Sequence, residues 1–192
     1  MLYTLGRIIT GLALGISLGV ALGYISALWN PIHSFLSPFM TIIRCTPVAS
    51  FIVIMLFMVD DNGKIPAIIA ILMVLPIIWQ STADAFGKID RDLYEVSAVF
   101  NFSFKKKIRY VYVPTVNKHL VPAIINSIGL SWKAGVAAEI ITYTKNSIGI
   151  EISYAKDAWA GAEIFAWTLV VVLLSLGLEY LAKRLLRRVN RI

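Results

Sequence analysis

The chain has 192 residues, of which 58% are hydrophobic and 15% are charged, and its formal net charge at pH 7 is +7. Soluble domains contain roughly 45–50% apolar and about 25% charged residues, so this composition excludes an ordinary soluble protein and predicts one integral membrane domain over residues 1–192. The single cysteine, Cys45, excludes an intrachain disulfide framework and any CxxC metal site.

Five segments are apolar and long enough to span a membrane, because a spanning helix needs about 20 mostly apolar residues. We expect these helices at about 8–28, 40–59, 65–83, 119–142 and 163–183. Lipid offers no hydrogen-bond partners to the backbone, which makes helices the default for such segments. The predicted fold class is therefore an all-α polytopic membrane protein with five spanning helices.

The first helix carries glycines at every fourth position: Gly11, Gly15, Gly19 and Gly23. This spacing puts them on nearly one face, and a small-residue face lets two helix backbones approach closely in lipid. Two interpretations stay open. The face packs against another helix of the same subunit, which is favoured, or it forms a contact between subunits.

The connection to the second helix, residues 29–38, contains two prolines among aromatic and polar residues, and this predicts a bent interfacial segment. Arg44 follows near the start of the second helix. It either snorkels to the interface or makes a structural or gating contact inside the bundle. Pro76 lies within the third helix, where a proline produces a kink that can line a pathway or serve packing alone.

The fourth helix holds two ionisable residues, Lys133 and Glu139. Six residues correspond to about 600° of rotation, so their side chains lie about 120° apart and do not form an i,i+4 pair. Lys133 shares its face with Asn126, and Glu139 lies nearer the outer end. Because charge at membrane depth is costly, Lys133 either lines a pathway or gate or forms a buried pair with another helix. Glu139 has the further alternative of a plain interface residue.

Positive charge is distributed unevenly between the two ends of the predicted bundle. Thirteen of the 18 Lys and Arg residues fall on the side of the 84–118 segment and the C-terminal tail, four fall on the other side, and Lys133 is left inside a helix. The positive-inside rule then places the N-terminus outside and the C-terminus in the cytoplasm. This distribution suits the anionic inner face of a membrane, so we expect no nucleic-acid partner.

The sequence contains no catalytic constellation. It has no phosphate-binding loop with the Walker A pattern and no GxSxG motif, and His33 and His119 have no supporting nucleophile or ligands. We therefore predict no enzyme, no metal site and no cofactor in this chain. Active transport would need a separate partner with a nucleotide site.

The segment Asp92–Pro114 separates the third and fourth helices. Asp92 and Glu95 form a plausible capping box for a short helix from about Leu93 to Phe102. Leu93, Tyr94, Ala98 and Phe102 give this helix an apolar aspect, although it is too short to span a membrane. From the pattern alone it could lie on the bilayer, pack under its own bundle or dock into a partner.

The order of residues in this segment resembles a known signature. Glu95-Val96-Ser97, then Asn101, then Val111-Tyr112-Val113-Pro114 is similar in spacing to the EAA–x3–G–x9–I–x–L–P pattern of type I ABC transporter permeases. Asn101 replaces the glycine, and Asn tolerates positive φ better than other non-Gly residues. Arg44–Ala49 and Ser131–Glu139 resemble segments of the nitrate, sulfonate, taurine and thiamine-precursor branch. The chain looks like a minimal five-helix core that lacks an additional N-terminal helix of that branch.

The resemblance implies the following arrangement. Two permease subunits, expected as a homodimer, form the translocation pathway in a bacterial or archaeal inner membrane, and an extracytoplasmic solute-binding protein delivers the substrate. Two cytoplasmic ATPase subunits bind ATP and Mg and each receives one coupling helix, here about 92–102 within a loop over about 84–118. The implied docking residues are Asp92, Leu93, Tyr94, Glu95, Ser97, Ala98, Asn101, Phe102 and Pro114.

The candidate pathway or gate residues are Arg44, Pro76, Asn126, Lys133 and Glu139. A lysine facing the pathway favours an anion, such as a sulfonate or nitrate, while a thiamine-pyrimidine precursor is the other substrate class of the branch. The alternative function is a secondary transporter that works alone through Lys133 and Glu139. The lack of an internal repeat counts against it.

Overall fold

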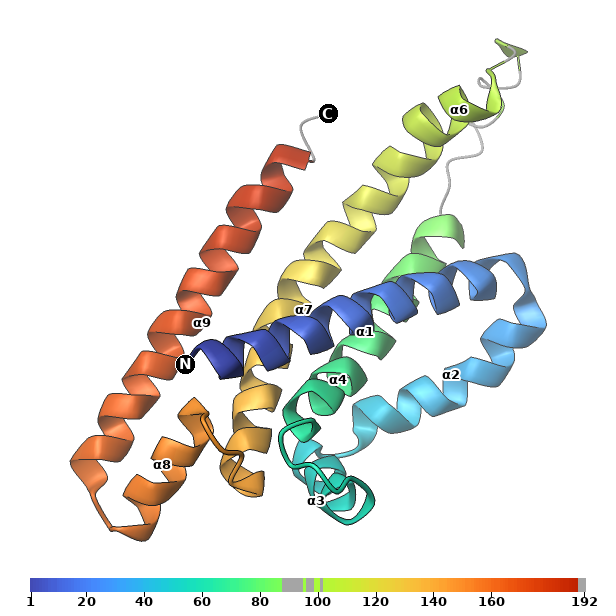
Figure 1. The fold of residues 1–192 in the computed structure, drawn as a ribbon. Coiled ribbons are helices and arrows are strands. Elements are labelled where there is room, and N and C mark those ends of the chain that lie inside the picture. Colours follow the sequence, from blue (N-terminus) through green and yellow to red (C-terminus); the bar gives the residue numbers. More distant parts are fainter. Residues whose placement is uncertain (88–94, 96–98, 101, 190–192) are drawn as a thin grey trace.

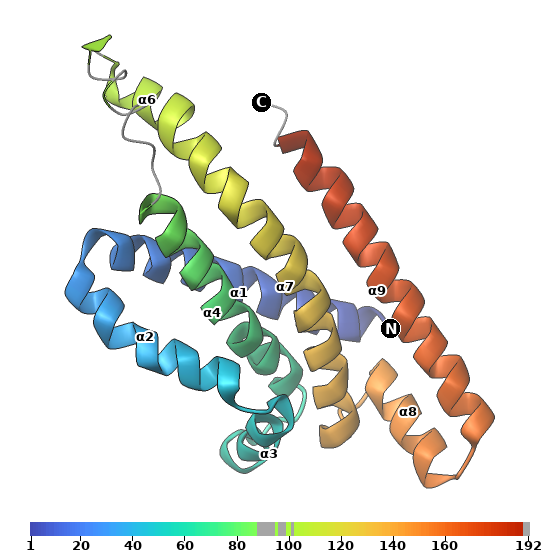
Figure 2. The same cartoon turned by 180° about the vertical axis from the view of Figure 1, so that it is seen from behind.

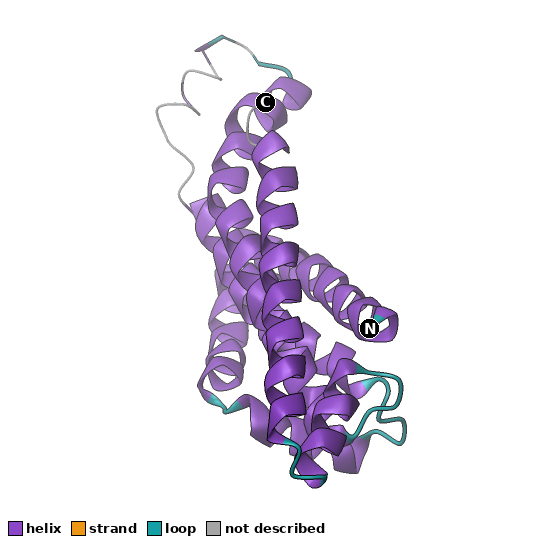
Figure 3. Ribbon diagram, turned by 90° about the vertical axis from the view of Figure 1, so that its left-hand side faces the viewer, coloured by secondary structure: helices purple, strands orange, loops and turns teal. Residues whose placement is uncertain are grey.

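The computed structural model describes the chain except residues 88–94, 96–98, 101 and 190–192 (Figure 1). The described residues form helices joined by short loops and no strand (Figure 3). In chain order the elements are α1 (Leu2–Leu28), α2 (Asn30–Cys45), α3 (Val48–Met58), α4 (Ile65–Gly87), α6 (Phe104–Lys107), the π-helix η1 (Ile108–Tyr112), α7 (Val113–Thr142), α8 (Ile148–Asp157) and α9 (Gly161–Val189).

Four helical stretches in the described part are long and apolar enough to cross a membrane, and they contain α1, α4, α7 and α9. The predicted all-α fold with helices of membrane-spanning length is therefore present among the described residues. The expected single helix over 40–59 is wrong, because α2 and α3 meet there at a bend of 102°. Thr46 is extended (φ −80°, ψ 131°) and precedes Pro47, and a residue before proline is disfavoured in the helical region.

The loop expected over 84–118 is shorter than its charge suggested. α4 continues to Gly87, and the chain is again helical from Phe104, so that α6, η1 and α7 follow one another without a break. Lysine and arginine are good helix formers, and they extend the helix beyond its apolar part. Pro114 cannot donate a backbone hydrogen bond, and the turn before it is a wider π-turn, in which Val113 N donates to Ile108 O.

The glycine face of α1 packs against α4 of the same subunit. A Cβ added to Gly19 would lie 2.8 Å from Ile78 Cβ, and one added to Gly23 would lie 2.6 Å from the Trp79 carbonyl oxygen. Trp79 Nε1 also donates to Ser26 Oγ at 2.8 Å across the same interface. The packing alternative within one subunit is thus the one that the structure has.

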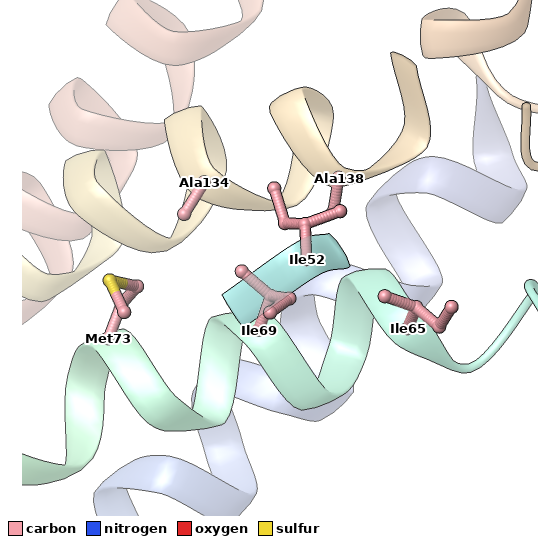
Figure 4. Close-up of a cluster of buried hydrophobic side chains, with 6 residues drawn as sticks. All are labelled: Ile52, Ile65, Ile69, Met73, Ala134 and Ala138. Carbon is pink, nitrogen blue, oxygen red and sulfur yellow. The ribbon is translucent and has the colours of Figure 1, made fainter. Parts of the chain in front are cut away.

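The core between α3, α4 and α7 consists of aliphatic side chains facing small ones (Figure 4). Ile52 of α3 and Ile69 and Met73 of α4 pack against Ala134 and Ala138 of α7. The alanines let α4 and α7 lie close together along their length. α9 lies at the edge of the bundle beside α7 and α8, and none of its most apolar 18 residues is buried (Figure 2).

The start of α1, the end of α7 and the start of α8 are held together by one buried carboxylate. Glu139 is 0% exposed, and its Oε2 accepts hydrogen bonds from Thr4 Oγ1 at 3.1 Å and from Gly149 N at 3.3 Å. Its Oε1 lies 3.6 Å from Arg7 Nη1. A carboxylate at the N-terminal end of a helix is stabilised by the unpaired N–H groups there, so Glu139 fixes α8 as well as α1.

Gly23→Ala should lower the stability of the protein by about 1–3 kcal/mol, because the new methyl group meets backbone atoms of α4 that cannot move aside. Gly6→Ala is the matched control on the same helix, since its Cβ would have no neighbour within 4 Å. Thermal melting in detergent measures both variants. Equal melting temperatures for the two would contradict the packing described here.

Arg7→Ala should lower stability by about 3–5 kcal/mol, because it leaves the buried carboxylate of Glu139 without its cation. Thr4→Val removes one hydrogen bond to the same carboxylate and should cost about 1–3 kcal/mol. Lys64→Ala breaks an ion pair with Asp61 that is largely solvent-exposed, and it should change the melting temperature little. Similar losses of stability for Arg7→Ala and Lys64→Ala would show that the buried Arg7–Glu139 pair stabilises the protein no more than the exposed pair does.

Candidate functional site

A chain of hydrogen-bonded polar side chains runs along one edge of α4. Arg44 Nη2, at the end of α2, donates to the Pro76 carbonyl oxygen and to Gln80 Oε1, both at 3.4 Å. Gln80 Nε2 in turn donates to Asp84 Oδ1 at 2.8 Å. The structure therefore brings Arg44 and Pro76 together. Gln80 and Asp84 were not predicted, although their i,i+4 spacing near the end of an apolar helix was a usable signal.

Two polar side chains lie on one exposed face of α7. Asn126 and Lys133 are both exposed and are seven residues apart, which returns the helix to nearly the same face. Leu130 and Ala137, on the neighbouring positions, pack against the core cluster between α3, α4 and α7. Asn126 and Lys133 therefore lie on the side of α7 that faces α3, away from Trp132, which packs toward α9.

The polar side chains along α4 and those on α7 lie at comparable depths of the bundle. α4 and α7 run antiparallel (Figure 1), and Met73 and Ala134 share one core cluster. Gln80 lies seven residues after Met73 on α4, and Ser127 lies seven residues before Ala134 on α7. Each step is a rise of about 10 Å in the same direction along the bundle. Asn126 is thus near the level of Gln80, and Lys133 near that of Met73. We call the five residues Arg44, Gln80, Asp84, Asn126 and Lys133 the Arg44–Lys133 surface.

Glu139 does not belong to this surface. Its described contacts are Arg7, Thr4 and Gly149, all toward the start of α1 and of α8. Lys133 and Glu139 point in different directions, as expected from their separation along the helix. Glu139 therefore holds helix ends together inside the subunit, while Lys133 remains open to whatever covers α7.

The predicted docking segment is described only in part. Asp92, Leu93, Tyr94, Ser97, Ala98 and Asn101 lie outside the described residues. Glu95 is exposed, Phe102 packs against Tyr110 with ring centroids 6.3 Å apart, and Pro114 is exposed in the first turn of α7. Val99 and Phe100, which were not predicted, are 79% and 71% exposed. Large apolar side chains this exposed are typical of a contact surface.

The opposite end of the bundle carries a smaller polar cluster. Lys156 Nζ donates to Tyr143 Oη at 3.0 Å, and Tyr143 Oη donates to Asp157 Oδ2 at 2.9 Å. The hydrogen bond to Tyr143 raises the pKa of Lys156. The adjacent Trp159 is 94% exposed. Together these residues make a projecting surface after α8.

The described residues contain no group of three or more His, Cys, Asp or Glu side chains that could hold a metal ion. His33 stacks on Trp79, with ring centroids 5.1 Å apart, which is a packing contact between α2 and α4. The charged and hydrogen-bonding groups of the Arg44–Lys133 surface lie on α4 and α7 and at the end of α2.

Comparison with solved structures finds a similar fold. The chain aligns with a chain of an inward-facing MetNI methionine ABC transporter at a TM-score of 0.75, with 16% sequence identity, over 97% of this chain and 93% of that one. At this identity the likeness concerns the fold alone.

Two curated relatives are bacterial permease proteins. A permease protein named for aliphatic sulfonate transport, SsuC of Bacillus subtilis, is 24% identical over 166 residues, which are 85% of this chain and 59% of that protein. The bicarbonate transport system permease protein CmpB of Synechocystis sp. is 26% identical over 188 residues, 95% of this chain and 66% of that protein. The chain thus spans less than two thirds of the length of these relatives.

A family model covers almost the entire sequence. The model for the inner membrane component of binding-protein-dependent transport systems matches residues 11–191. This range contains the described helices from α2 to α9, most of α1 and the whole Arg44–Lys133 surface. The chain therefore belongs to the family of binding-protein-dependent transport system inner membrane components.

Proposed function

We propose that this chain is the membrane-spanning subunit of an ABC importer for a small anion, and that the Arg44–Lys133 surface lines its translocation pathway. The observation that carries the proposal is the exposure of two cations: Lys133 on the spanning helix α7, and Arg44 at the end of α2, where it donates to Pro76 and Gln80 of the spanning helix α4. A charged side chain at membrane depth normally faces the bundle interior or a water-filled cavity rather than lipid. In an assembled importer, a second permease subunit would cover this side and enclose a polar pathway.

The chemistry of the surface favours an anionic solute. Arg44 is held by neutral acceptors, the Pro76 carbonyl and the Gln80 amide, so its charge is not neutralised by a direct ion pair there. Lys133 has no ion-pair partner among the described residues. The relatives are named for sulfonate and bicarbonate transport, and both solutes are anions. A sulfonate, bicarbonate or nitrate is accordingly the proposed substrate class.

Energy would come from a separate ATPase that docks on the segment between α4 and α6. The exposed apolar Val99 and Phe100, next to Glu95, support such a contact. α6, η1 and α7 form one uninterrupted helical rod from this segment to the pathway residues. A rigid rod of this kind would transmit movement of the docking segment to Asn126 and Lys133.

The orientation follows from charge. Figure 1 places α6 and the C-terminal end of α9 at the same end of the bundle, and both ends are basic. The positive-inside rule would put this end in the cytoplasm, with the N-terminus and α8 on the outer side. The projecting Trp159 next to Tyr143 and Lys156 would then meet the solute-binding protein.

A secondary transporter acting alone is less well supported. That alternative needs Glu139 as an exchangeable charge, yet Glu139 is engaged by Arg7, Thr4 and Gly149 and holds the helix ends together. Its titration would disrupt the packing of α1 and α8 rather than carry an ion across. Proteoliposomes that contain the chain without an ATPase should therefore show no uptake.

Lys133→Glu should reduce uptake of an anion by about tenfold or more, because it replaces attraction by repulsion at a cost of about 1.4 kcal/mol or more. The measurement is ATP-driven uptake of a sulfonate, bicarbonate or nitrate by the complex in proteoliposomes. Lys133→Arg should retain uptake, and Lys145→Glu, an exposed lysine at the outer turn, serves as control. Normal uptake by a well-folded Lys133→Glu complex would remove Lys133 from the pathway.

The double variant Glu95→Arg and Ala98→Asp should uncouple ATP hydrolysis from uptake, because it reverses one charge and buries another in the proposed docking contact. Hydrolysis and uptake are measured on the same proteoliposomes. Ser103→Asp, an exposed position just beyond the predicted helix, is the control and should leave the ratio of the two rates unchanged. If the double variant also keeps this ratio, the docking assignment is wrong.

A further inference from the structure

A groove with an aromatic floor opens at the basic end of the bundle. Tyr24 of α1 meets Phe86 of α4 edge-on with ring centroids 5.1 Å apart, and Phe86 lies 6.3 Å from the Tyr112 ring of η1. Leu28 and Val116 extend the lining on either side. The groove has a volume of about 420 Å³, within the range of roughly 300–1,000 Å³ typical of ligand sites.

The walls of this groove are apolar and belong to helices of spanning length. Its lining combines aliphatic and aromatic side chains of α1, α4, η1 and α7, with Asn117 as a polar exception. An unfilled apolar groove forfeits dispersion contacts along its walls. A flexible hydrocarbon chain restores these contacts, and the bilayer supplies such chains at high concentration.

The cytoplasmic end of the groove is basic. Val113 lines the groove, Arg109 precedes it by about one helical turn, and Lys105 precedes Arg109 by about another turn. Arg109 and Lys105 are both exposed. They therefore continue the groove-lining side of the helix beyond the apolar part. Basic residues beside a spanning helix attract anionic headgroups by about 1 kcal/mol each.

We propose that this groove binds one anionic glycerophospholipid. An acyl chain lies between Tyr24 and Tyr112, and the phosphate meets Lys105 and Arg109. The basic rim favours an anionic lipid over a zwitterionic one. The apolar walls match the acyl chain of this lipid, and the basic rim matches its phosphate headgroup.

The position of the groove gives the lipid a mechanical consequence, which rests on the proposed function. Phe86 precedes the predicted docking helix at about 92–102, and Ile108 follows it, and both line the groove. A bound acyl chain therefore contacts the helix that precedes the proposed docking segment in the sequence and the helix that follows it. It would hold them at a fixed spacing while the ATPase moves the segment.

Binding is measured on the purified full chain without ATPase or substrate. The delipidated protein in detergent is titrated with phosphatidylglycerol or phosphatidylcholine, and native mass spectrometry with thermal melting reports the bound lipid. One phosphatidylglycerol should be retained about tenfold more tightly than phosphatidylcholine. Equal retention of the two lipids would overturn the proposal. A failure of the transport proposal would leave this result unaffected, because no transport is measured.

Two variants and one matched control locate the site. Val116→Trp fills the groove and should abolish retention of the tight lipid, while Arg109→Gln should remove the preference for phosphatidylglycerol and keep the fold, since Arg109 is exposed. Lys118→Gln removes one exposed charge from the same helix. Lys118 is five residues from Val113, about 140° around the axis, and its loss should have no effect.

Three outcomes would overturn the assignment. Equal loss of preference in Arg109→Gln and Lys118→Gln indicates diffuse attraction to the basic end. Tight retention by a folded Val116→Trp protein places the lipid elsewhere. Finally, if Arg109→Gln leaves lipid retention unchanged but weakens association with the ATPase, the basic rim is a protein contact.

Discussion

The close approach of α1 to α4 is the constraint on which the remaining architecture depends. Gly19 and Gly23 leave room for Ile78 and for the backbone around Trp79, so α4 is covered on one side by another helix at minimal distance. Its opposite side then packs on α7 through Ala134 and Ala138. α4 becomes the central helix of the subunit, and its remaining edge, with Gln80 and Asp84, is the one that stays polar. A side chain at the glycine positions would separate α1 from α4 and shift this edge relative to α7.

The charges near the membrane fall into two groups with different roles. Glu139 is fully buried; its Oε2 accepts hydrogen bonds from Thr4 and from the N-terminus of α8, and its Oε1 lies 3.6 Å from Arg7, so the buried carboxylate has a nearby cation. Arg44 and Lys133 are exposed on the other side of the bundle, where a single subunit provides only neutral acceptors or none. Glu139 stabilises a single subunit, whereas Arg44 and Lys133 need a polar environment that lies outside it. The structural role of Glu139 follows from its contacts, and a pathway role is proposed for Arg44 and Lys133 because they are exposed.

Features that depend on neighbouring residues could be predicted from the sequence, whereas contacts between residues far apart in the sequence could not. The spans of α1, α4, α7 and α9 follow from continuous apolar length, and the small-residue face of α1 follows from its spacing. The bend at Thr46–Pro47 was missed because the apolar run continues across it, although a residue before proline was a local warning. The partners of Glu139 could not be inferred, since Thr4 lies 135 positions away and any of several helices could have supplied them. For the same reason Arg44 and Pro76 were both named as candidates without any indication that they touch.

α4 and η1, which precede and follow the proposed docking segment in the sequence, meet at one place in the structure. Phe86, at the end of α4, and Tyr112, at the start of the α7 rod, meet in one aromatic row with Tyr24 of α1. α1 is itself locked to α4 by its glycines and to α7 by the Arg7–Glu139 pair at the far end. If the segment between α4 and α6 docks as proposed, its displacement would move α4 or α7 and would disturb this row. The aromatic groove would then be a point at which a bound lipid could affect that movement.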